Sequence, residues 1–272
     1  MGKITLKNYD VSSNINKKIV VISDIHYYSK YDKKKLDKVI KKIENIKPDF
    51  ICIPGDIVDE AKIFDLDLFI EWLTSLARIS KVVIALGNHE LFITKGHIQS
   101  NADELIKNIK KIDSIIYLDN SIYKVDNINF IGITMPFDYY YKLDENKDYF
   151  VKYFNSKFKK IDNKYNILLC HSPVCIGNKS VFDKLIISSK LDLVLSGHMH
   201  GGITPNFLKN ILRGRGIISP RRKILEKNCY GYHKINNTSF IISSGITIAS
   251  HMNRFRFLDK FFSSEIIVIN LK

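Results

Sequence analysis

Carboxylate, amide and imidazole side chains come directly after apolar runs at five places in this chain. In order, the five segments are Asp24-Ile-His26, Gly55-Asp56-Ile-Val-Asp59, Gly87-Asn88-His89-Glu90, His171 and Gly197-His198-Met-His200. Such a mixture of nitrogen and oxygen donors suits Mn, Fe, Zn or Co, and it suits Ca or thiolate-bound structural zinc poorly. The residue types therefore predict a transition-metal centre.

The donors outnumber those that one ion can use. Two ions that share a carboxylate would engage the whole set. A pair of ions about 3.5–4 Å apart can hold phosphate oxygens and activate a water molecule. The donor set therefore predicts a two-metal centre that acts on phosphate esters.

The elements that must position these donors alternate between short strands and helices. Apolar runs predict strands, some ending in turns, at 17–23, 49–56, 81–90, 115–117, 122–125, 128–133, 165–170, 191–196, 239–245 and 264–271. Helical spacing predicts helices at 32–46, 65–79, 103–112 and 144–158. This alternation predicts an α/β fold with a mostly parallel or mixed sheet and helices packed outside it. Ligands of such sheets gather at the carboxyl ends of the strands, so the donors should share one edge.

Taken together and in order, the five motifs resemble those of the calcineurin-like metallophosphoesterases, and the resemblance covers residues 24–200. It implies a four-layer αββα sandwich of two mixed sheets flanked by helices. It also implies one metallophosphoesterase domain over residues 1–272, with a basic and apolar insertion or cap at about 203–227.

The resemblance also assigns the metal ligands. It places Asp24, His26 and His200 on one ion, and Asn88, His171 and His198 on the other. Asp56 would bridge the two. The ions would be two divalent transition metals, with manganese preferred and iron, zinc, cobalt or nickel as alternatives.

The same resemblance assigns the catalytic residues. His89 would protonate the leaving oxygen, and a metal-bridging hydroxide would attack the phosphorus without a covalent intermediate. Asp59 would orient His89 and raise its pKa. Asp59 could instead cap the following helix, and the two roles are compatible.

The segment after the last motif is basic and apolar. Residues 203–227 hold seven basic residues and one acidic residue among Ile, Leu and Phe. Six of the seven arginines follow residue 212, and we name Arg213 and Arg215 as candidate substrate-binding residues because guanidinium groups hold phosphate in a bidentate way. Arg254 is a third candidate, because its position resembles that of an arginine in one branch of the family. The segment could be a surface excursion or a cap that serves an anionic lipid or a nucleotide-like diphosphate.

This layout resembles the membrane-associated bacterial phosphodiesterase branch of the family, which includes enzymes similar to UDP-2,3-diacylglucosamine pyrophosphohydrolase. The chain has Ile203 where that branch usually has glutamine after the two glycines. We expect a phosphodiester, pyrophosphate or phosphomonoester substrate, with amphipathic and nucleotide-like molecules as candidates.

The overall charge keeps a second function class open. The net charge of +14 and the abundance of lysine fit either a solvated surface or a nuclease or nucleic-acid phosphatase. A non-catalytic scaffold on the same fold is a third alternative, although all the expected ligands are present. No obligate protein partner is evident.

The cysteine pattern and the lengths of the apolar runs indicate where in the cell the protein is expected. The four cysteines form no CxxC pair, which indicates free buried thiols in a reducing compartment. The sequence has neither an apolar run of about 18–20 residues nor a secretory signal pattern. We therefore expect a cytoplasmic protein, with peripheral contact at the inner face of an anionic membrane as a candidate interaction.

Overall fold

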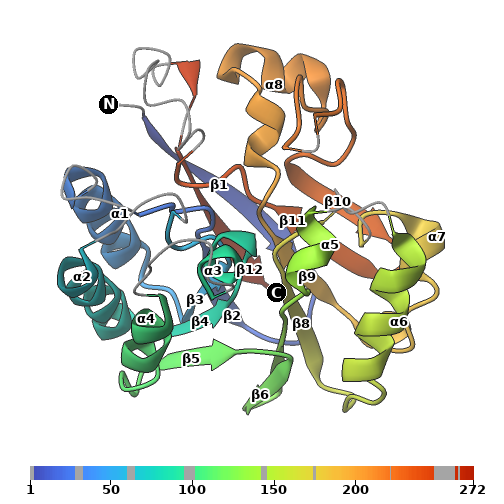
Figure 1. The fold of residues 1–272 in the computed structure, drawn as a ribbon, viewed down its shortest axis with the longest axis horizontal. Helices are drawn as coiled ribbons and strands as arrows, with labels where there is room; N and C mark the ends of the chain where they lie inside the picture. The colour runs from blue at the N-terminus through green and yellow to red at the C-terminus, as the bar shows by residue number, and fades with distance from the viewer. Residues whose placement is uncertain are drawn as a thin grey trace.

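In a computed structural model of the chain, two six-stranded sheets form the centre of the fold (Figure 1). The structure describes residues 3–27, 33–59, 65–94, 102–141, 146–173, 176–220, 222–247, 261–262 and 264–272. The first sheet has the order β1-β12-β2-β3-β4-β5. Its strands are β1 (Ile4–Val11), β2 (Lys17–Val21), β3 (Phe50–Pro54), β4 (Lys81–Ala85), β5 (Ile115–Leu118) and β12 (Ser264–Leu271). All neighbours are parallel except β12 and β2, so the sheet is mixed.

The second sheet has the order β10-β11-β9-β8-β7-β6. Its strands are β6 (Ser121–Val125), β7 (Ile128–Ile133), β8 (Tyr165–Cys170), β9 (Leu193–Ser196), β10 (Gly231–Ile235) and β11 (Thr238–Ile242). The four inner strands are parallel to one another, and the two edge strands, β6 and β10, are antiparallel to their neighbours.

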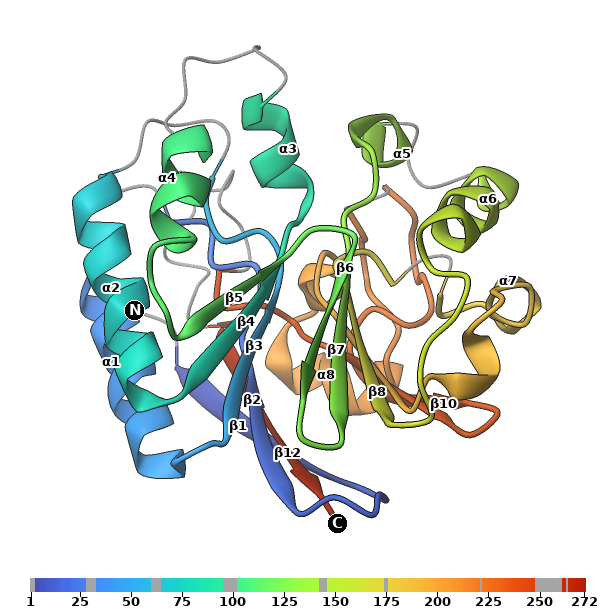
Figure 2. The ribbon, with the colours of Figure 1, turned by 90° about the horizontal axis from the view of Figure 1, so that it is seen from below.

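Helices cover the outer faces of both sheets, which gives four layers (Figure 2). Against the first sheet lie α1 (Lys33–Ile46), α2 (Leu66–Ile79) and α4 (Ala102–Ile109). Against the second lie α5 (Phe137–Tyr141), α6 (Lys147–Lys157) and α7 (Lys179–Phe182). A third apolar core fills the space between the sheets and includes Cys52, Val83, Ile167 and Leu195. The predicted αββα arrangement of two mixed sheets is confirmed.

The helices follow from the apolar spacing of the sequence. In α1, Leu36, Val39 and Ile43 recur at helical intervals and are fully or almost fully buried. In α2, Asp65 caps the amino end by accepting a hydrogen bond from the Leu68 N–H. Trp72 lies on the buried face of α2, and its ring N–H donates to the Leu36 carbonyl of α1.

Several elements lie outside the predicted set, including the short helices α5 and α7. The edge strands β1 and β10 carry mainly exposed or half-buried residues, so they lack the continuous apolar run that marked the inner strands. The short helices α3 (Asn88–Thr94) and α8 (Asn206–Leu212), and the 3-10 segments η2 (Ser188–Lys190) and η3 (His200–Ile203), were not predicted either. In the part of the chain that the structure describes, no helix has the length and apolar character needed to cross a bilayer.

Candidate metal centre

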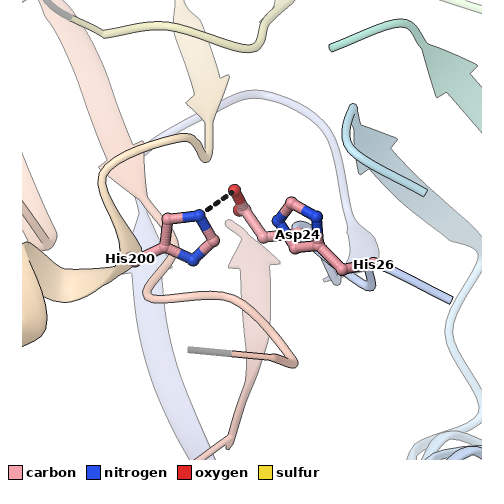
Figure 3. Close-up of side chains that lie close together, drawn as sticks. All are labelled: Asp24, His26 and His200. Atoms are coloured by element: carbon pink, nitrogen blue, oxygen red, sulfur yellow. Dashed lines mark ion pairs between the residues drawn. The ribbon is translucent and has the colours of Figure 1, made fainter. Parts of the chain in front are cut away.

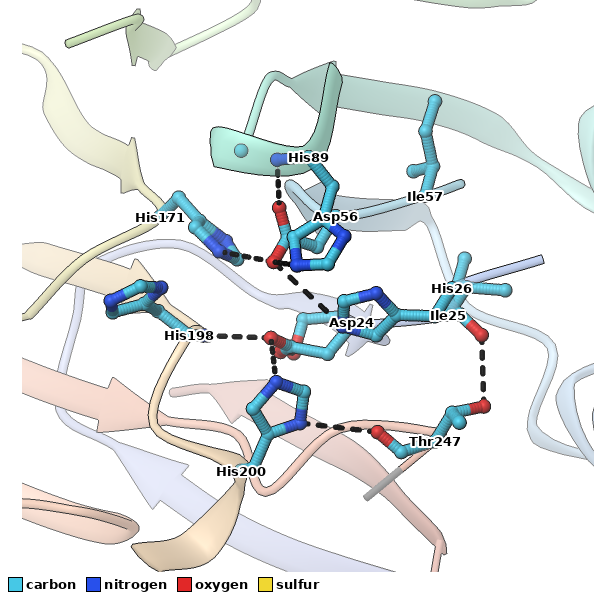
Figure 4. Close-up of polar contacts among 12 residues, drawn as sticks. Asp24, Ile25, His26, Asp56, Ile57, His89, His171, His198, His200 and Thr247 are labelled. Carbon is cyan, nitrogen blue, oxygen red and sulfur yellow. Dashed lines mark hydrogen bonds and ion pairs between the residues drawn. The ribbon is translucent and has the colours of Figure 1, made fainter. Parts of the chain in front are cut away.

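The predicted donors meet at the carboxyl ends of strands from both sheets. Asp24 and His26 follow β2, Asp56 follows β3, and Asn88 and His89 begin α3 after β4. From the second sheet, His171 follows β8, and His198 and His200 follow β9. Because these strand ends face one another across the sandwich, residues far apart in the sequence form one cluster (Figure 4). We call these residues the metal cluster.

One half of the metal cluster consists of Asp24, His26 and His200, whose donor atoms all lie within 4.8 Å of one another (Figure 3). The Nδ1 of His200 is 3.1 Å from the Thr247 carbonyl, which makes this nitrogen the N–H donor. The Nε2 of His200 lies 3.8 Å from Asp24 Oδ1. A backbone carbonyl that holds one ring nitrogen leaves the other available to a metal, a usual arrangement for histidine ligands.

The other half consists of Asp56, His171 and His198, whose donor atoms also lie within 4.8 Å of one another. His171 repeats the arrangement of His200. Its Nδ1 donates to the Pro54 carbonyl at 2.7 Å, and its Nε2 lies 2.9 Å from Asp56 Oδ2. These two groups agree with the sets that the resemblance implied for Asp24, His26 and His200 and for His171 and His198, while the place of Asn88 and ligation itself stay predictions.

Asp56 belongs to the second half and also lies close to His26 of the first, so it connects the two (Figure 4). Its Oδ2 is 3.8 Å from the Nε2 atoms of both His26 and His89. His26, Asp56 and His89 form a third group of donors within 4.8 Å of one another. The Oδ1 of Asp56 accepts a hydrogen bond from the His89 N–H at 3.0 Å, which fixes the carboxylate in place. This position suits a carboxylate shared by two ions.

Left-handed backbone recurs among these donors. The φ angles of Asp24, His26, Asp56, His198 and His200 lie between 47° and 67°. This conformation is uncommon for residues other than glycine and costs about 1–2 kcal/mol each. Strain of this kind concentrates at functional sites, where the surrounding structure holds the chain against it.

Unpartnered buried atoms test whether the metal cluster fits an ion. Within the described residues, neither ring nitrogen of His26 has a hydrogen-bond partner, nor does the Oδ1 of Asn88. His26 is 1% exposed, so water cannot readily satisfy its nitrogens. Buried polar atoms normally have partners. A transition metal would satisfy both residues, and the mixed N/O donor set suits such an ion.

The electrostatics of the metal cluster favour the protonation states that metals need at His26, His198 and Asp56, but not at His171. Burial lowers the pKa values of His26 and His198 well below the usual value, and neighbouring histidines lower them further. Burial alone would raise the pKa of the Asp56 carboxyl, but the imidazoles of His171 and His89 outweigh it and hold that pKa well below its usual range. Burial alone would lower the pKa of His171, but the Asp56 carboxylate outweighs it and raises that pKa to about 9. The metal-free protein therefore presents neutral imidazoles at His26 and His198, and a protonated His171 beside the ionised Asp56, whose proton a metal would displace.

Glu90, which the motif suggested to be structural, holds the loops of the metal cluster together through hydrogen bonds. Its side chain is fully buried. Its Oε2 accepts hydrogen bonds from the N–H groups of Gly87 and Asp56. Its Oε1 accepts from the N–H groups of Ile57 and Val58. Burial and the Asp56 carboxylate raise the pKa of Glu90 to about 7, against the opposing effect of these donors. Glu90 thus joins the loop after β3 to the loop after β4.

Gly87 leaves room for the Asp56 carboxylate. A methyl group added at Gly87 would overlap Asp56 Oδ1. We expect Gly87→Ala to displace this carboxylate and weaken manganese binding by about tenfold or more, as measured by calorimetric titration of metal-free protein. Gly177→Ala is the control, because Gly177 lies outside the left-handed region and its added methyl would be 3.1 Å or more from its neighbours, which are not predicted ligands. Equal manganese affinities in the two variants would contradict the prediction.

The other predicted site residues have different surroundings. Asp59 is fully buried and its N–H donates to the Tyr27 carbonyl, while its pairing with His89 stays a prediction. Arg213 and Arg215 are exposed, outside the buried metal cluster, and the Arg215 guanidinium donates to the Leu225 carbonyl at 3.4 Å. Arg254 lies outside the described residues.

The residue between the two histidines of the last motif packs away from the donors. Met199 is 1% exposed and contacts Cys229 and Ile242 in a small apolar cluster. Cys52, Cys170 and Cys229 are buried free thiols, as the cysteine pattern indicated. Cys175 lies outside the described residues.

A family model described as calcineurin-like phosphoesterase matches residues 17–202. This range contains every predicted metal ligand. An uncharacterized metallophosphoesterase of Helicobacter pylori is 30% identical over 186 residues, which are 68% of this chain and 45% of that protein. One of Campylobacter jejuni is 28% identical, over 98% of this chain and 63% of that protein. The chain thus spans roughly half to two thirds of these relatives' lengths.

The fold also has a counterpart among solved structures. A protein from Thermus thermophilus superposes with a TM-score of 0.50 at 11% sequence identity, covering 85% of this chain and 90% of that one. At this identity the similarity concerns the fold alone. It agrees with the arrangement of two sheets and flanking helices described above.

Proposed function

Because this chain belongs to the calcineurin-like phosphoesterase family, we propose that it hydrolyses phosphate esters with two divalent metal ions. The observation that carries the proposal is the meeting of two donor groups at Asp56, where Asp24, His26 and His200 face His171 and His198. Asn88 would add its unpartnered Oδ1 to the second group. Manganese is the preferred ion, and iron, zinc, cobalt and nickel suit the same donors.

Each part of the reaction falls to a named residue. When bound, the ions supply Lewis acidity for phosphate oxygens and lower the pKa of water. Asp56 would be the carboxylate that both ions share. His89, held at Asp56 by its own N–H, is positioned to donate a proton to the leaving oxygen, and Asp59 keeps it oriented.

The proposed substrate is a phosphodiester or pyrophosphate, with a phosphomonoester as the alternative. The basic and apolar segment after the last motif supports an amphipathic or nucleotide-like molecule, as in the membrane-associated branch that the sequence resembles. Arg213, Arg215 and Arg254 are proposed as phosphate contacts in addition to the metal cluster.

The proposal is tested by removing a ligand. We expect His200→Ala to lower the hydrolysis of bis(p-nitrophenyl) phosphate with manganese by roughly a hundredfold or more, because the imidazole is part of one donor group. His233→Ala is the matched control, since that histidine contacts the Tyr230 carbonyl outside the metal cluster. Full activity in His200→Ala would refute the assignment.

A substrate panel separates the alternatives. With manganese present, diester, monoester, nucleotide diphosphate and lipid phosphate substrates would be compared with single-stranded and duplex DNA. The net charge of +14 is the observation that favours a nuclease or nucleic-acid phosphatase. That alternative requires DNA cleavage and a gel shift that persists at physiological salt. A chain that binds no transition metal would be a scaffold.

A further inference from the structure

Large apolar side chains are exposed in the segment that follows the metal ligands. Of the ten such side chains exposed among the described residues, five lie between residues 207 and 225. They are Phe207 (68% exposed), Ile211 (71%), Ile218 (48%), Ile224 (76%) and Leu225 (49%). Scattered apolar residues are normal on a surface, but a concentration of this kind marks an interaction site. We call residues 203–220 and 222–227 the exposed segment.

The exposed side chains are paired by the local structure. Phe207 and Ile211 are four residues apart on α8, so they share one face of the helix. No residue of α8 is buried. Ile218 and Ile224 are partners across an isolated antiparallel bridge, which puts their side chains side by side. Helix and bridge lie together at one end of the molecule, away from the helices that cover the sheets (Figure 1).

The inner side of α8 contacts the rest of the protein through Lys209. Lys209, two residues from Phe207, lies on the opposite side of the helix. Its ammonium group donates to the Ser244 hydroxyl at 2.9 Å and lies 5.2 Å from the centre of the Tyr230 ring. The Tyr230 hydroxyl in turn donates to the Lys209 carbonyl. These contacts hold the Lys209 side of α8 against the rest of the protein. The opposite face, with Phe207 and Ile211, is therefore exposed to solvent.

The exposed segment is also attached beside the metal cluster. It begins directly after His200, Gly201 and Gly202, and these two glycines turn the chain with φ angles of 61° and 60°. The Ile218 N–H donates to the Gly202 carbonyl, and the Gly202 and Gly216 backbones pack so closely that a methyl on either would overlap the other. The bridge residue Ile218 is thus hydrogen-bonded to Gly202, two residues after the predicted ligand His200.

Charge decides which partner fits this surface. Besides Lys209, exposed Arg213, Arg215, Arg222, Lys223 and Lys227 accompany the apolar residues, and Glu226 is the one acidic residue. Cations mixed with protruding Phe and Ile suit the boundary of an anionic bilayer, where apolar side chains enter the acyl region and cations meet phosphate. A nucleic acid would engage the cations but leave the apolar side chains exposed. Protein interfaces are depleted in lysine.

We propose that the exposed segment docks this protein on the surface of an anionic phospholipid bilayer. Phe207 and Ile211 of α8, with the Ile218 and Ile224 bridge, enter the headgroup and acyl boundary, while the neighbouring arginines and lysines contact lipid phosphates. Docking in this way brings the metal cluster close to the lipid headgroups. The inference concerns binding and does not depend on the proposed hydrolysis.

Vesicle sedimentation with the full chain tests the proposal. We expect the protein to sediment with vesicles of phosphatidylcholine mixed with phosphatidylglycerol, to sediment far less with phosphatidylcholine alone, and to be released by salt. The double variant Phe207→Ser/Ile211→Ser should bind the mixed vesicles more than about tenfold less well, because two apolar side chains no longer leave water. Ile186→Ser is the matched control, since Ile186 is 59% exposed outside the segment, and it should bind normally.

Two further variants give independent readouts. Ile224→Ser should weaken vesicle binding because it removes an apolar side chain of the bridge, and it should leave α8 unaltered. Phe207→Trp should show a blue-shifted emission on adding mixed vesicles, over the constant background of Trp72, which is the natural tryptophan and only 6% exposed. All four variants should keep wild-type hydrolysis of a water-soluble aryl phosphodiester, so a failure of membrane docking is distinguishable from a failure of the proposed function.

Several outcomes would overturn the proposal. These are no binding to mixed vesicles, equal binding by wild type and the Phe207→Ser/Ile211→Ser double variant, or an unshifted Phe207→Trp emission. A dimer in light scattering that the double variant abolishes would instead assign the surface to a second copy of the chain. Retention of DNA at physiological salt that depends on Phe207 and Ile211 would assign it to nucleic acid.

Discussion

Asp56→Asn is expected to reduce the manganese-dependent hydrolysis of an aryl phosphodiester by roughly a thousandfold. Metal ions contribute several kcal/mol of transition-state stabilisation, and each 1.36 kcal/mol corresponds to a tenfold rate. Asp56 is the residue whose carboxylate lies within 3.8 Å of His26, His89 and His171, and it therefore connects both donor groups. An amide is neutral and has one acceptor oxygen, so it cannot bridge two cations.

The variant is chosen to leave the fold intact. Asparagine keeps the shape of the side chain and an Oδ1 that can accept the His89 N–H. We expect elemental analysis to show the bound manganese falling to at most about one ion per chain, with thermal unfolding of the metal-free protein little changed. Asp183→Asn is the control, because Asp183 is exposed and pairs with Lys179 and Asn236. Unaltered turnover and metal content in Asp56→Asn would contradict the two-metal proposal.

Glu90→Ala is expected to lower the free energy of unfolding of the metal-free protein by about 3–5 kcal/mol. The substitution removes the acceptor of four backbone N–H groups in a fully buried position, and each buried donor left without a partner costs about 1–3 kcal/mol. Water entering the vacated space would recover part of that cost. The free energy of unfolding of a typical protein is only about 5–15 kcal/mol, so the expected loss of stability is large. Urea unfolding followed by circular dichroism measures it.

Two further variants test whether the lost stability comes from the hydrogen bonds to Glu90. Glu90→Gln keeps one acceptor oxygen but turns an NH₂ group toward two of the four donors, so it should also destabilise, by less than Glu90→Ala. Glu71→Ala removes an exposed glutamate from α2 and should change stability by less than about 0.5 kcal/mol. Wild-type stability in Glu90→Ala would mean that these N–H groups do not rely on Glu90.

Asp56 and Glu90 have different roles in the metal cluster. Asp56 faces the predicted ions, whereas Glu90 holds the backbone from which Asp56 projects. The Asp56 N–H donates to Glu90, and Asp56 itself lies in the left-handed region at φ 52°. The hydrogen bonds from this short stretch to Glu90 offset backbone strain that the chain would otherwise release by moving the carboxylate. Loss of Glu90 should therefore also weaken manganese binding.

The sequence by itself determined the chemistry and most of the elements. Inner strands such as β3 and β8 are continuous apolar runs because both of their faces are buried, and amphipathic helices such as α1 are periodic because one face is. The ordered donor motifs between residues 24 and 200 indicated a metal centre because donor types follow from side-chain chemistry. Edge strands β1 and β10 escaped prediction because an edge that faces water needs no apolar run.

Only the tertiary structure decided how the donors are held and what surrounds them. The orientation of His200 depends on the Thr247 carbonyl, and the His198 N–H donates to Asp24 across 174 residues. Neither contact leaves a local pattern, because the first joins the ends of the neighbouring strands β9 and β11 and the second joins the two sheets. The same holds for Glu90, whose four donors come from two loops, and for Phe207 and Ile211, whose helical spacing fits a buried face equally well. Spacing shows which residues share a face, but whether that face is covered depends on the rest of the fold.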